Sequence, residues 1–292
     1  MLIMNILRKY GTTYFVVLLA VIAGIVWYAI FTLEARHELR LTVFDIGQGD
    51  SIFIEASNGN QVLIDGGPSN AILGKLGGVM PFWDRSINLI ILTHPHADHV
   101  AGLIEVLKRY DVGMVLESGV NYSTAEYAEW RRLLKEKQIR VIIARAGQKI
   151  HLSSKTELNI LTPFDSFIEK SPSNIHDAMV ISRLIYASSS VLLMGDAEKY
   201  FEYRLLLSGV DLKSDILKVG HHGSKTSTTE DFVRAVSPKY AVISVGRKNR
   251  YGHPTQQTLD TLAKFGIQTF RTDQDHDVEF TSDGSRFERV GN

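Results

Sequence analysis

The sequence predicts an α/β fold in which two mixed β-sheets pack face to face, with helices on their outer faces and a separate apolar helix at the N-terminus. In residues 39–292, apolar runs of strand length outnumber helical patterns. Helical patterns separate some of these strands, and two sheets with helices outside would bury both kinds of element. Residues 10–33 contain no charged side chain, which sets them apart from the rest.

The N-terminal segment has the length and composition of a membrane span. From Tyr10 to Leu33, 24 uncharged residues would form a helix about 36 Å long, against about 30 Å for the bilayer core. Trp27 and Tyr28 fall where an interfacial aromatic belt is expected. The flank after Leu33 lacks a clean small-residue cleavage site, which disfavours a signal peptide. We therefore expect residues 1–38 to be a transmembrane anchor with its span at about 11–33.

The charges around this span predict its orientation. Arg8 and Lys9 precede it, and Arg36 and Arg40 follow it, so Lys and Arg alone give a tie. The N-terminal amine favours an inside N-terminus. The expected product is a single-pass protein of the cell membrane with residues 39–292 as one extracytoplasmic domain.

Composition excludes several classes of protein. The chain of 292 residues is 45% hydrophobic and 22% charged, which is typical of a globular protein rather than a disordered one. Lys and Arg number 32, as do Asp and Glu, so binding to nucleic acid would need a local basic patch. Cysteine is absent, which leaves His, Asp and Glu as the strong metal ligands.

Residues 39–292 predict eleven strands and five helices. The strands are expected at Leu41–Ile46, Ser51–Glu55, Gln61–Ile64, Leu89–Leu92, Met114–Leu116, Arg140–Ile143, Leu158–Leu161, Val180–Tyr186, Val191–Met194, Ile216–Val219 and Ala241–Val245. The helices are expected at Val100–Tyr110, Ala125–Glu136, Ala197–Leu207, Thr229–Ala235 and Thr255–Phe265.

The strongest chemical signal is a cluster of four metal-competent side chains within six residues. His94, His96, Asp98 and His99 directly follow the apolar strand Leu89–Leu92. A strand end fixes the direction of the following loop, so His94 and His96 can converge on one ion while Asp98 and His99 reach a neighbouring one. The alternative, a surface loop that is rich in histidine by chance, is disfavoured because this spacing is rare.

This cluster and several other segments resemble the metallo-β-lactamase superfamily and, more narrowly, the C-terminal domain of ComEC-type DNA-uptake proteins. The segments are residues 43–51, 63–67, 94–99, 195–196, 217–227 and 251–254. The resemblance covers nearly all of residues 39–285 and implies an αββα four-layer sandwich with a dinuclear metal site at one edge of the two sheets. The multi-helix channel segment of a full ComEC has no counterpart here, so transport would need a separate channel as a partner.

The resemblance also assigns roles to individual residues. It implies that Asp65 orients a metal-binding histidine and that Asp196 bridges both ions. It expects one ligand from the pair His221 and His222. Adjacent residues on an extended segment point to opposite sides, so both would not bind the same ion easily, and we favour His222.

His176 departs from the ComEC pattern, in which asparagine is common at this position. A histidine here, 20 residues before Asp196, would complete a triad with His94 and His96. The alternative is a solvated loop histidine, with Asn174 and Asp177 as nearby polar groups. Met179 replaces the serine that is usual in the resembling sequences.

A second set of residues is expected to contact substrate. His253, in Tyr-Gly-His-Pro, is either a proton donor or phosphate contact at the pocket rim, or a histidine of the loop before a helix. Basic residues near the motifs predict a patch for a phosphodiester backbone, unless they are simply a solvated face. The expected contacts are Ser224, Lys225, Arg247, Lys248 and Arg250, with Lys218 as a further member of the patch.

These residues predict a metal-dependent hydrolase. Ligands that are all nitrogen and oxygen suit two zinc ions, with manganese as the alternative. Two such ions lower the pKa of water and stabilise a developing oxyanion. We expect a phosphodiesterase or nuclease acting on single-stranded DNA, with Asp98, Asp196 and His253 as catalytic residues. The alternatives are hydrolysis of a cell-surface phosphodiester such as a phosphorylcholine ester, opening of a lactone or β-lactam, and a non-catalytic membrane-tethered DNA-binding module.

Overall fold

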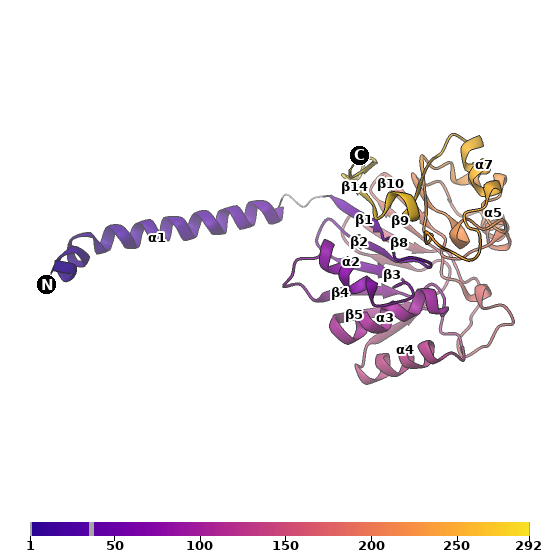
Figure 1. Ribbon diagram of the computed structural model, residues 1–292, viewed down its shortest axis with the longest axis horizontal. Coiled ribbons are helices and arrows are strands. Elements are labelled where there is room, and N and C mark those ends of the chain that lie inside the picture. Colours follow the sequence, from indigo (N-terminus) through magenta and orange to yellow (C-terminus); the bar gives the residue numbers. More distant parts are fainter. Residues whose placement is uncertain (1, 35–37, 292) are drawn as a thin grey trace. The chain divides into compact units, whose positions relative to one another are not determined.

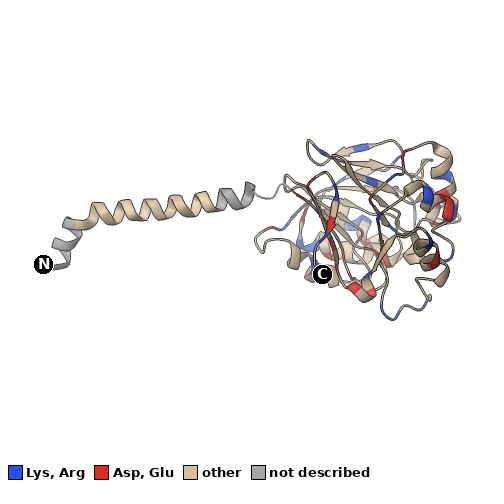
Figure 2. Cartoon of the chain, turned by 90° about the horizontal axis from the view of Figure 1, so that it is seen from above, with Lys and Arg blue, Asp and Glu red and all other residues tan. Residues whose placement is uncertain are grey.

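The computed structural model describes residues 2–34 and 38–291, which belong to two compact units, 1–37 and 38–292. The first contains α1 (Leu2–Glu34), whose segment Tyr10–Tyr28 is apolar enough and long enough to cross a membrane. Figure 2 shows no charged residue along the tan part of this helix, whereas both signs of charge are scattered over the second unit. Arg36, used for the predicted orientation, lies outside the described residues.

The first sheet of the second unit has eight strands in the order β15-β14-β1-β2-β3-β4-β5-β6 (Figure 1). Their bounds are β1 Leu39–Val43, β2 Ile52–Glu55, β3 Gln61–Ile64, β4 Ser86–Ile91, β5 Asp111–Glu117, β6 Arg140–Ile143, β14 Val278–Ser282 and β15 Phe287–Arg289. Strands β3 to β6 run parallel, and β1, β2 and β14 pair antiparallel.

The second sheet has seven strands in the order β13-β12-β11-β10-β9-β8-β7. Their bounds are β7 Lys149–His151, β8 Thr156–Ile160, β9 Ser182–Tyr186, β10 Ser189–Leu193, β11 Ile216–Lys218, β12 Tyr240–Ile243 and β13 Gln268–Arg271. Strands β10 to β13 are parallel, so their carboxyl ends meet at one edge of the sheet.

Alternation along the strands builds a four-layer sandwich. Val62 and Ile64 of β3 enter the core between the sheets, while Leu63 faces the outer helices. The outer face of the first sheet is covered by α2 (Ala71–Val79), α3 (Ala97–Arg109) and α4 (Ala125–Glu136). The outer face of the second is covered by α5 (Lys199–Ser208), α6 (Glu230–Val236) and α7 (Gln256–Lys264). The predicted fold class is confirmed.

The sequence patterns missed several short elements. Strands β7, β13, β14 and β15 and helices α2 and α8 (Thr272–Asp275) were not predicted. Helix α2 contains three glycines, which weaken a helical pattern, and the missed strands are only three to five residues long. The 3₁₀ turns η1 (Ile175–Ala178) and η2 (Gly220–Gly223) complete the elements of the described residues.

One predicted boundary was wrong in a way that matters for chemistry. Helix α3 begins at Ala97, with His96 preceding its first turn, rather than at Val100. Asp98 and His99 therefore lie on the first turn of a helix and not in a loop. Helix α3 packs closely on the chain after β3, because a Cβ on Gly102 would lie 1.9 Å from the carbonyl oxygen of Gly66.

Candidate metal centre

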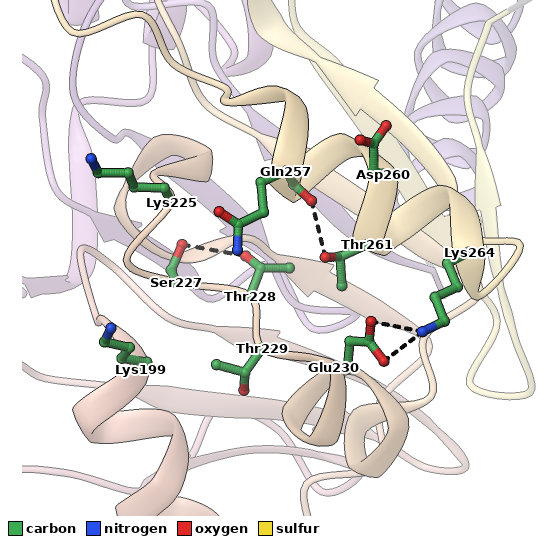
Figure 3. A pocket seen from close by; sticks show the side chains of 10 residues that line it. All are labelled: Lys199, Lys225, Ser227, Thr228, Thr229, Glu230, Gln257, Asp260, Thr261 and Lys264. Atoms are coloured by element: carbon green, nitrogen blue, oxygen red, sulfur yellow. Dashed lines mark hydrogen bonds and ion pairs between the residues drawn. The ribbon is translucent and has the colours of Figure 1, made fainter.

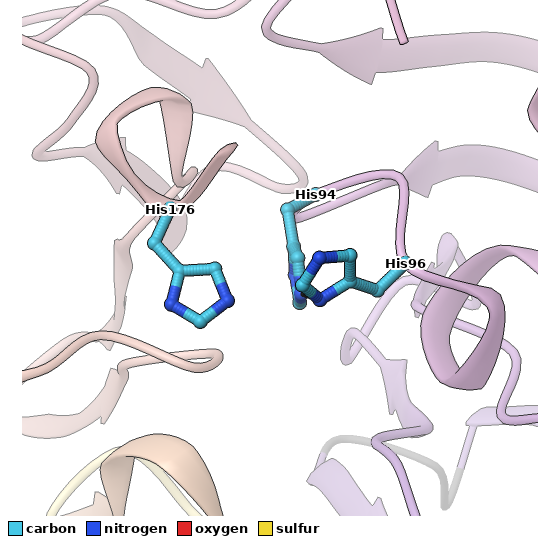
Figure 4. A group of neighbouring side chains, drawn as sticks. All are labelled: His94, His96 and His176. Atoms are coloured by element: carbon cyan, nitrogen blue, oxygen red, sulfur yellow. Dashed lines mark hydrogen bonds between the residues drawn. The ribbon is translucent and has the colours of Figure 1, made fainter. Parts of the chain in front are cut away.

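The first group of candidate ligands consists of three histidines. His94 follows β4, His96 precedes α3, and His176 comes from η1. One ring nitrogen of each lies within 4.8 Å of those of the other two. Figure 4 shows the imidazole of His176 facing those of His94 and His96, and its ring centroid is 5.2 Å from each. The structure thus brings together the three histidines of the predicted triad.

The second group joins one sheet to the other. Asp98 and His99 come from α3, Asp196 follows β10, and His222 lies in η2; one ligand atom of each lies within 4.8 Å of the others. Asp196 lies between the groups, because its Oδ2 is 3.4 Å from His99 Nε2 and 3.8 Å from His94 Nε2. Its Oδ1 is 3.3 Å from His222 Nε2. This position fits the expected bridging role.

Asp65 contacts the ring nitrogen of His99 that faces away from Asp196. Its Oδ2 lies 2.7 Å from His99 Nδ1 and accepts a 2.6 Å hydrogen bond from the Thr93 hydroxyl. Its Oδ1 accepts from the backbone N–H of Thr93 at 2.8 Å. An ionised Asp65 therefore favours the proton of His99 on Nδ1 and leaves Nε2 facing Asp196.

The two adjacent histidines separate, although the predicted reason was wrong. The segment is not extended, because His221 and His222 have φ of 46° and 53° in a left-handed turn. The carbonyl of Ser244 lies 2.9 Å from His222 Nδ1, which leaves Nε2 toward Asp196. His221 Nδ1 lies instead 3.0 Å from Glu198 Oε1, and His221 groups with Glu198 and His176.

Electrostatics prepare both groups for a cation. Burial, reinforced by neighbouring His99, lowers the pKa of His94 well below its ordinary value, which keeps it neutral. Burial would raise the pKa of Asp196, but the imidazoles of His222 and His99 hold it well below its ordinary value. Burial would lower the pKa of His99, but Asp196 and Asp65 raise it well above its ordinary value. A cation bound beside Asp196 would replace that stabilising proton.

The donor set fits divalent metal ions. Among the described residues, buried His99 Nε2, His222 Nε2 and Asp196 Oδ1 have no hydrogen bond of good geometry, and all three belong to the second group. Buried polar atoms are rarely left without a partner, and these converge on one another. Imidazole and carboxylate donors in this arrangement suit zinc, and the two carboxylates of the second group also suit manganese.

The structure corrects the prediction for Lys218. Its ammonium group is buried and donates to Asp50 Oδ2 at 2.8 Å and to the carbonyl of Val219 at 3.0 Å. Lys218 therefore cannot belong to a surface patch. Asp50 Oδ1 lies 3.5 Å from His222 Nδ1, so this ion pair packs against the imidazole of His222 in the second group. The sequence contained one indication of this ion pair, because Asp50 lies in the motif at residues 43–51. The sequence analysis gave Asp50 no role.

The loop after β12 forms an exposed rim. Arg247, Lys248 and Arg250 are exposed, as expected of a basic surface. Asn249 closes the loop by donating to the carbonyl of His253 at 2.8 Å, while its Oδ1 accepts from the backbone N–H of His253 at 2.9 Å. The loop ends beside the metal groups, with the rings of His253 and His221 5.8 Å apart.

Ser224 and Lys225 are adjacent in sequence but differ in exposure. Ser224 is buried and its hydroxyl is 3.0 Å from that of Thr226, so it lies beneath the surface. Lys225 is exposed and lines a cavity of about 620 Å³ together with Lys199. Figure 3 shows these two lysines on one side and the Glu230–Lys264 ion pair across from them.

Comparisons with known proteins agree with this architecture. Residues 44–247 match the family described as the metallo-beta-lactamase superfamily. The chain is 29% identical to ComE operon protein 3 of Bacillus subtilis over 83% of this chain and 33% of that protein. It is 28% identical to competence protein ComA of Neisseria gonorrhoeae over 84% of this chain and 32% of that protein. The chain thus spans about a third of the length of these ComEC-like relatives.

A solved structure shows the same fold. Igni18, a metallo hydrolase from the archaeon Ignicoccus hospitalis, aligns with a TM-score of 0.55 at 13% identity, over 82% of this chain and 98% of that one. The family match at residues 44–247 includes the candidate ligands that follow β4 in the first sheet and those that follow β10 and β11 in the second. From its family match, its four-layer fold and its two ligand groups, the chain belongs to the metallo-β-lactamase superfamily of metal-dependent hydrolases.

Proposed function

We propose that this protein hydrolyses phosphodiester bonds of single-stranded DNA, using two divalent metal ions. Zinc is the first choice and manganese the alternative. The observation that carries the proposal is the position of Asp196 between two ligand groups, beside a loop with exposed cations. A dinuclear site that is open to a charged polymer matches phosphodiester chemistry.

The chain's own residues divide the work. His94, His96 and His176 would hold one ion, and the second group would hold the other, with Asp196 shared. When bound, the ions supply an activated water and charge stabilisation for the attacked phosphate. Asp98 is the most exposed member of the second group, so it is best placed to meet solvent and substrate.

His253 is favoured as a phosphate contact over a proton donor. Burial and the neighbouring His221 lower the pKa of His253, so its imidazole is neutral near pH 7. Its Nδ1 is buried and has no hydrogen-bond partner among the described residues. A neutral ring can still donate one N–H to a phosphoryl oxygen, which orients the leaving group.

A strand longer than one nucleotide would find further contacts. Exposed Arg247, Lys248 and Arg250 can neutralise phosphates on one side, and Lys225 and Lys199 can do so at the cavity of Figure 3. Tyr251 is 69% exposed and stacks on His253 at 5.8 Å, which offers an aromatic face to a base. These contacts favour an extended nucleic acid over a phosphorylcholine ester.

Location and partners belong to the same proposal. The apolar helix supports a membrane anchor, and Arg8 and Lys9 before it support a hydrolase unit outside the cytoplasm. One relative is named competence protein ComA, which supports a context of DNA uptake with a separate channel.

The test is cleavage of labelled single-stranded DNA by the purified full chain in detergent, loaded with zinc or with manganese. Asp196→Asn, which keeps the shape but removes the shared charge, is expected to abolish cleavage. The parallel arms contain duplex DNA, a chromogenic phosphorylcholine ester and a chromogenic β-lactam. The DNA proposal is wrong if a metal-loaded chain cleaves only one of the last two substrates. Tight DNA binding without turnover, equal in wild type and Asp196→Asn, would favour a non-catalytic module.

A further inference from the structure

Two large aromatic side chains lie exposed on the hydrolase unit, away from the ligand groups. Phe82 is 81% exposed and Trp83 is 72% exposed, and their rings meet edge to face with centroids 4.8 Å apart. They lie between α2 and β4. Adjacent exposed aromatic residues of this size commonly mark a contact surface.

The loop that carries them is fixed by hydrogen bonds. The backbone N–H of Asp84 donates to the carbonyl of Pro81 at 2.9 Å, which closes a turn around the two aromatic residues. Asp84 Oδ1 accepts from the backbone N–H of Ser86 at 3.0 Å, and Asp84 Oδ2 accepts from Gln61 Nε2 at 2.7 Å. The turn is therefore tied to the beginnings of β3 and β4 and presents the rings outward.

This loop lies at the end of the sheet where the chain enters the unit. Arg40 of β1 pairs with Glu55, and Glu55 pairs with Gln61 of β3, which contacts Asp84. The beginnings of β1, β3 and β4 therefore share one end of the sheet, and β1 and β4 are three strand spacings apart, about 14 Å. Figure 1 shows the loop between α2 and β4 on the side where β1 begins.

The sequence before β1 indicates that a membrane can reach the surface formed by Phe82 and Trp83. Only residues 35–38 separate the last residue of α1 from Leu39, so five Cα–Cα steps limit the distance between Glu34 and Leu39 to about 18 Å. Helix α1 contains the segment Tyr10–Tyr28 that is fit to cross a bilayer. The helical residues 29–34 add about 9 Å, so a membrane that holds this segment keeps the beginning of β1 within about 27 Å of the end of the segment.

We propose that Phe82 and Trp83 insert into the interfacial layer of the lipid bilayer and form a second membrane contact of this chain. Aromatic side chains prefer that layer, and Trp can keep its indole N–H in the hydrated headgroup region. His94 and the other ligands from the first sheet follow the opposite end of β4, about 20 Å away along that strand. The contact therefore turns the metal centre toward the aqueous phase. The proposal requires α1 to span the membrane, and it is independent of the reaction catalysed.

Lipid-selective quenching of tryptophan fluorescence tests the contact in the full chain. The chain has three tryptophans: Trp27 in the apolar segment, Trp83, and Trp130, which is buried and donates to Glu117 at 2.7 Å. Wild type, Trp27→Phe and the double variant Trp27→Phe/Trp83→Phe are reconstituted in phosphatidylcholine vesicles, with and without bromine on the acyl chains near the headgroup. The difference between the two variants isolates the emission of Trp83.

The expected result is loss of the Trp83 emission in brominated vesicles, with little quenching by acrylamide in the water. The double variant should be unaffected by bromine. Efficient quenching by acrylamide but not by lipid would overturn the proposal, since Trp83 would then be in water. Shielding from both quenchers would also overturn it, because a protein would cover the rings. If Trp27 escapes lipid quenching in the wild type, α1 is not inserted and the proposal fails with it.

Discussion

The imidazole Nδ1 of His99 lies 2.7 Å from Oδ2 of Asp65, and both side chains are completely buried. Asp65→Asn would replace the acceptor with an amide that can donate, so the proton of His99 would no longer be held on Nδ1. We expect the affinity for the second metal ion to fall about 10- to 100-fold, as for other residues that support a ligand. Competition with a chromophoric chelator measures this affinity.

The matched control for Asp65→Asn is Asp111→Asn, at an exposed aspartate where β5 begins. It should bind metal as the wild type does. Unchanged metal affinity in Asp65→Asn would show that Asp65 does not orient the ligand.

His222 and His221 are expected to respond differently to substitution. His222 Nε2 faces Asp196, so His222→Ala should release the ion of the second group. His221 pairs with Glu198, so His221→Ala should retain both ions and lose part of the hydrolysis. Metal content after gel filtration and the rate of DNA cleavage separate the two effects. Loss of metal from His221→Ala but not from His222→Ala would reverse the assignment.

His176 tests whether this chain departs from the asparagine that resembling sequences have. We expect His176→Asn to lower the retained metal from two ions toward one, because His94 and His96 then lack their third imidazole. His151→Asn, at an exposed histidine of β7, is the control and should retain both. Elemental analysis of dialysed protein decides, and two ions in His176→Asn would remove His176 from the ligand set.

The apolar pattern was sufficient to predict the sandwich but not all of its strands. Leu63 alternates with Val62 and Ile64 between two cores, and such alternation identifies a strand that is buried on both faces. Strand β14 pairs with β1 across more than 230 residues of sequence, a relation that no local pattern reveals. The sequence analysis placed His94, His96 and Asp196 after strands. These side chains lie close together because the carboxyl ends of those strands lie at the same edge of the sandwich.

The parts of the site that sequence could not predict depend on contacts between distant residues. Lys218 and Lys225 look alike in the motif, yet one is buried against Asp50 and the other lines an open cavity. The left-handed turn at His221 and His222 similarly decides which imidazole reaches Asp196. Histidine tolerates a left-handed backbone, but two adjacent histidines do not by themselves predict that turn.

The Lys218–Asp50 pair predicts a stability effect. Burial would raise the pKa of Asp50, but Lys218 and His222 lower it below its ordinary value, so the carboxylate is charged. Lys218→Met would leave this charge buried without its partner, and we expect a loss of about 3–5 kcal/mol in the free energy of unfolding. Urea unfolding of the full chain in detergent measures it.

Two variants make the loss at Lys218 interpretable. Asp50→Asn/Lys218→Met should recover part of the stability, since no buried charge remains. Lys213→Met, at an exposed lysine, should cost little. If Lys218→Met is as stable as Lys213→Met, the pair does not hold the structure.

Glu202 predicts a change of stability with pH. It is buried on α5 and accepts a 2.8 Å hydrogen bond from the backbone N–H of Thr229. Burial raises its pKa above the ordinary value of 4.5, although the hydrogen bonds from Thr229 and Thr228 oppose the rise. Because the folded state holds this proton more tightly than the unfolded state, the contribution to stability is complete below about pH 4.5 and is lost as the pH rises through the raised pKa.

The difference between variants isolates this contribution from that of the histidines. Between the two pKa values the slope attributable to Glu202 approaches about 1.4 kcal/mol per pH unit. In metal-free protein, Glu202→Gln should lack this slope, while Glu230→Gln, at an exposed glutamate, should keep it. Denaturant unfolding of each full-length variant between about pH 4.5 and 7.5 provides the measurement. Equal slopes in wild type and Glu202→Gln would mean that Glu202 titrates alike in the folded and unfolded chain, and that its burial has no electrostatic cost.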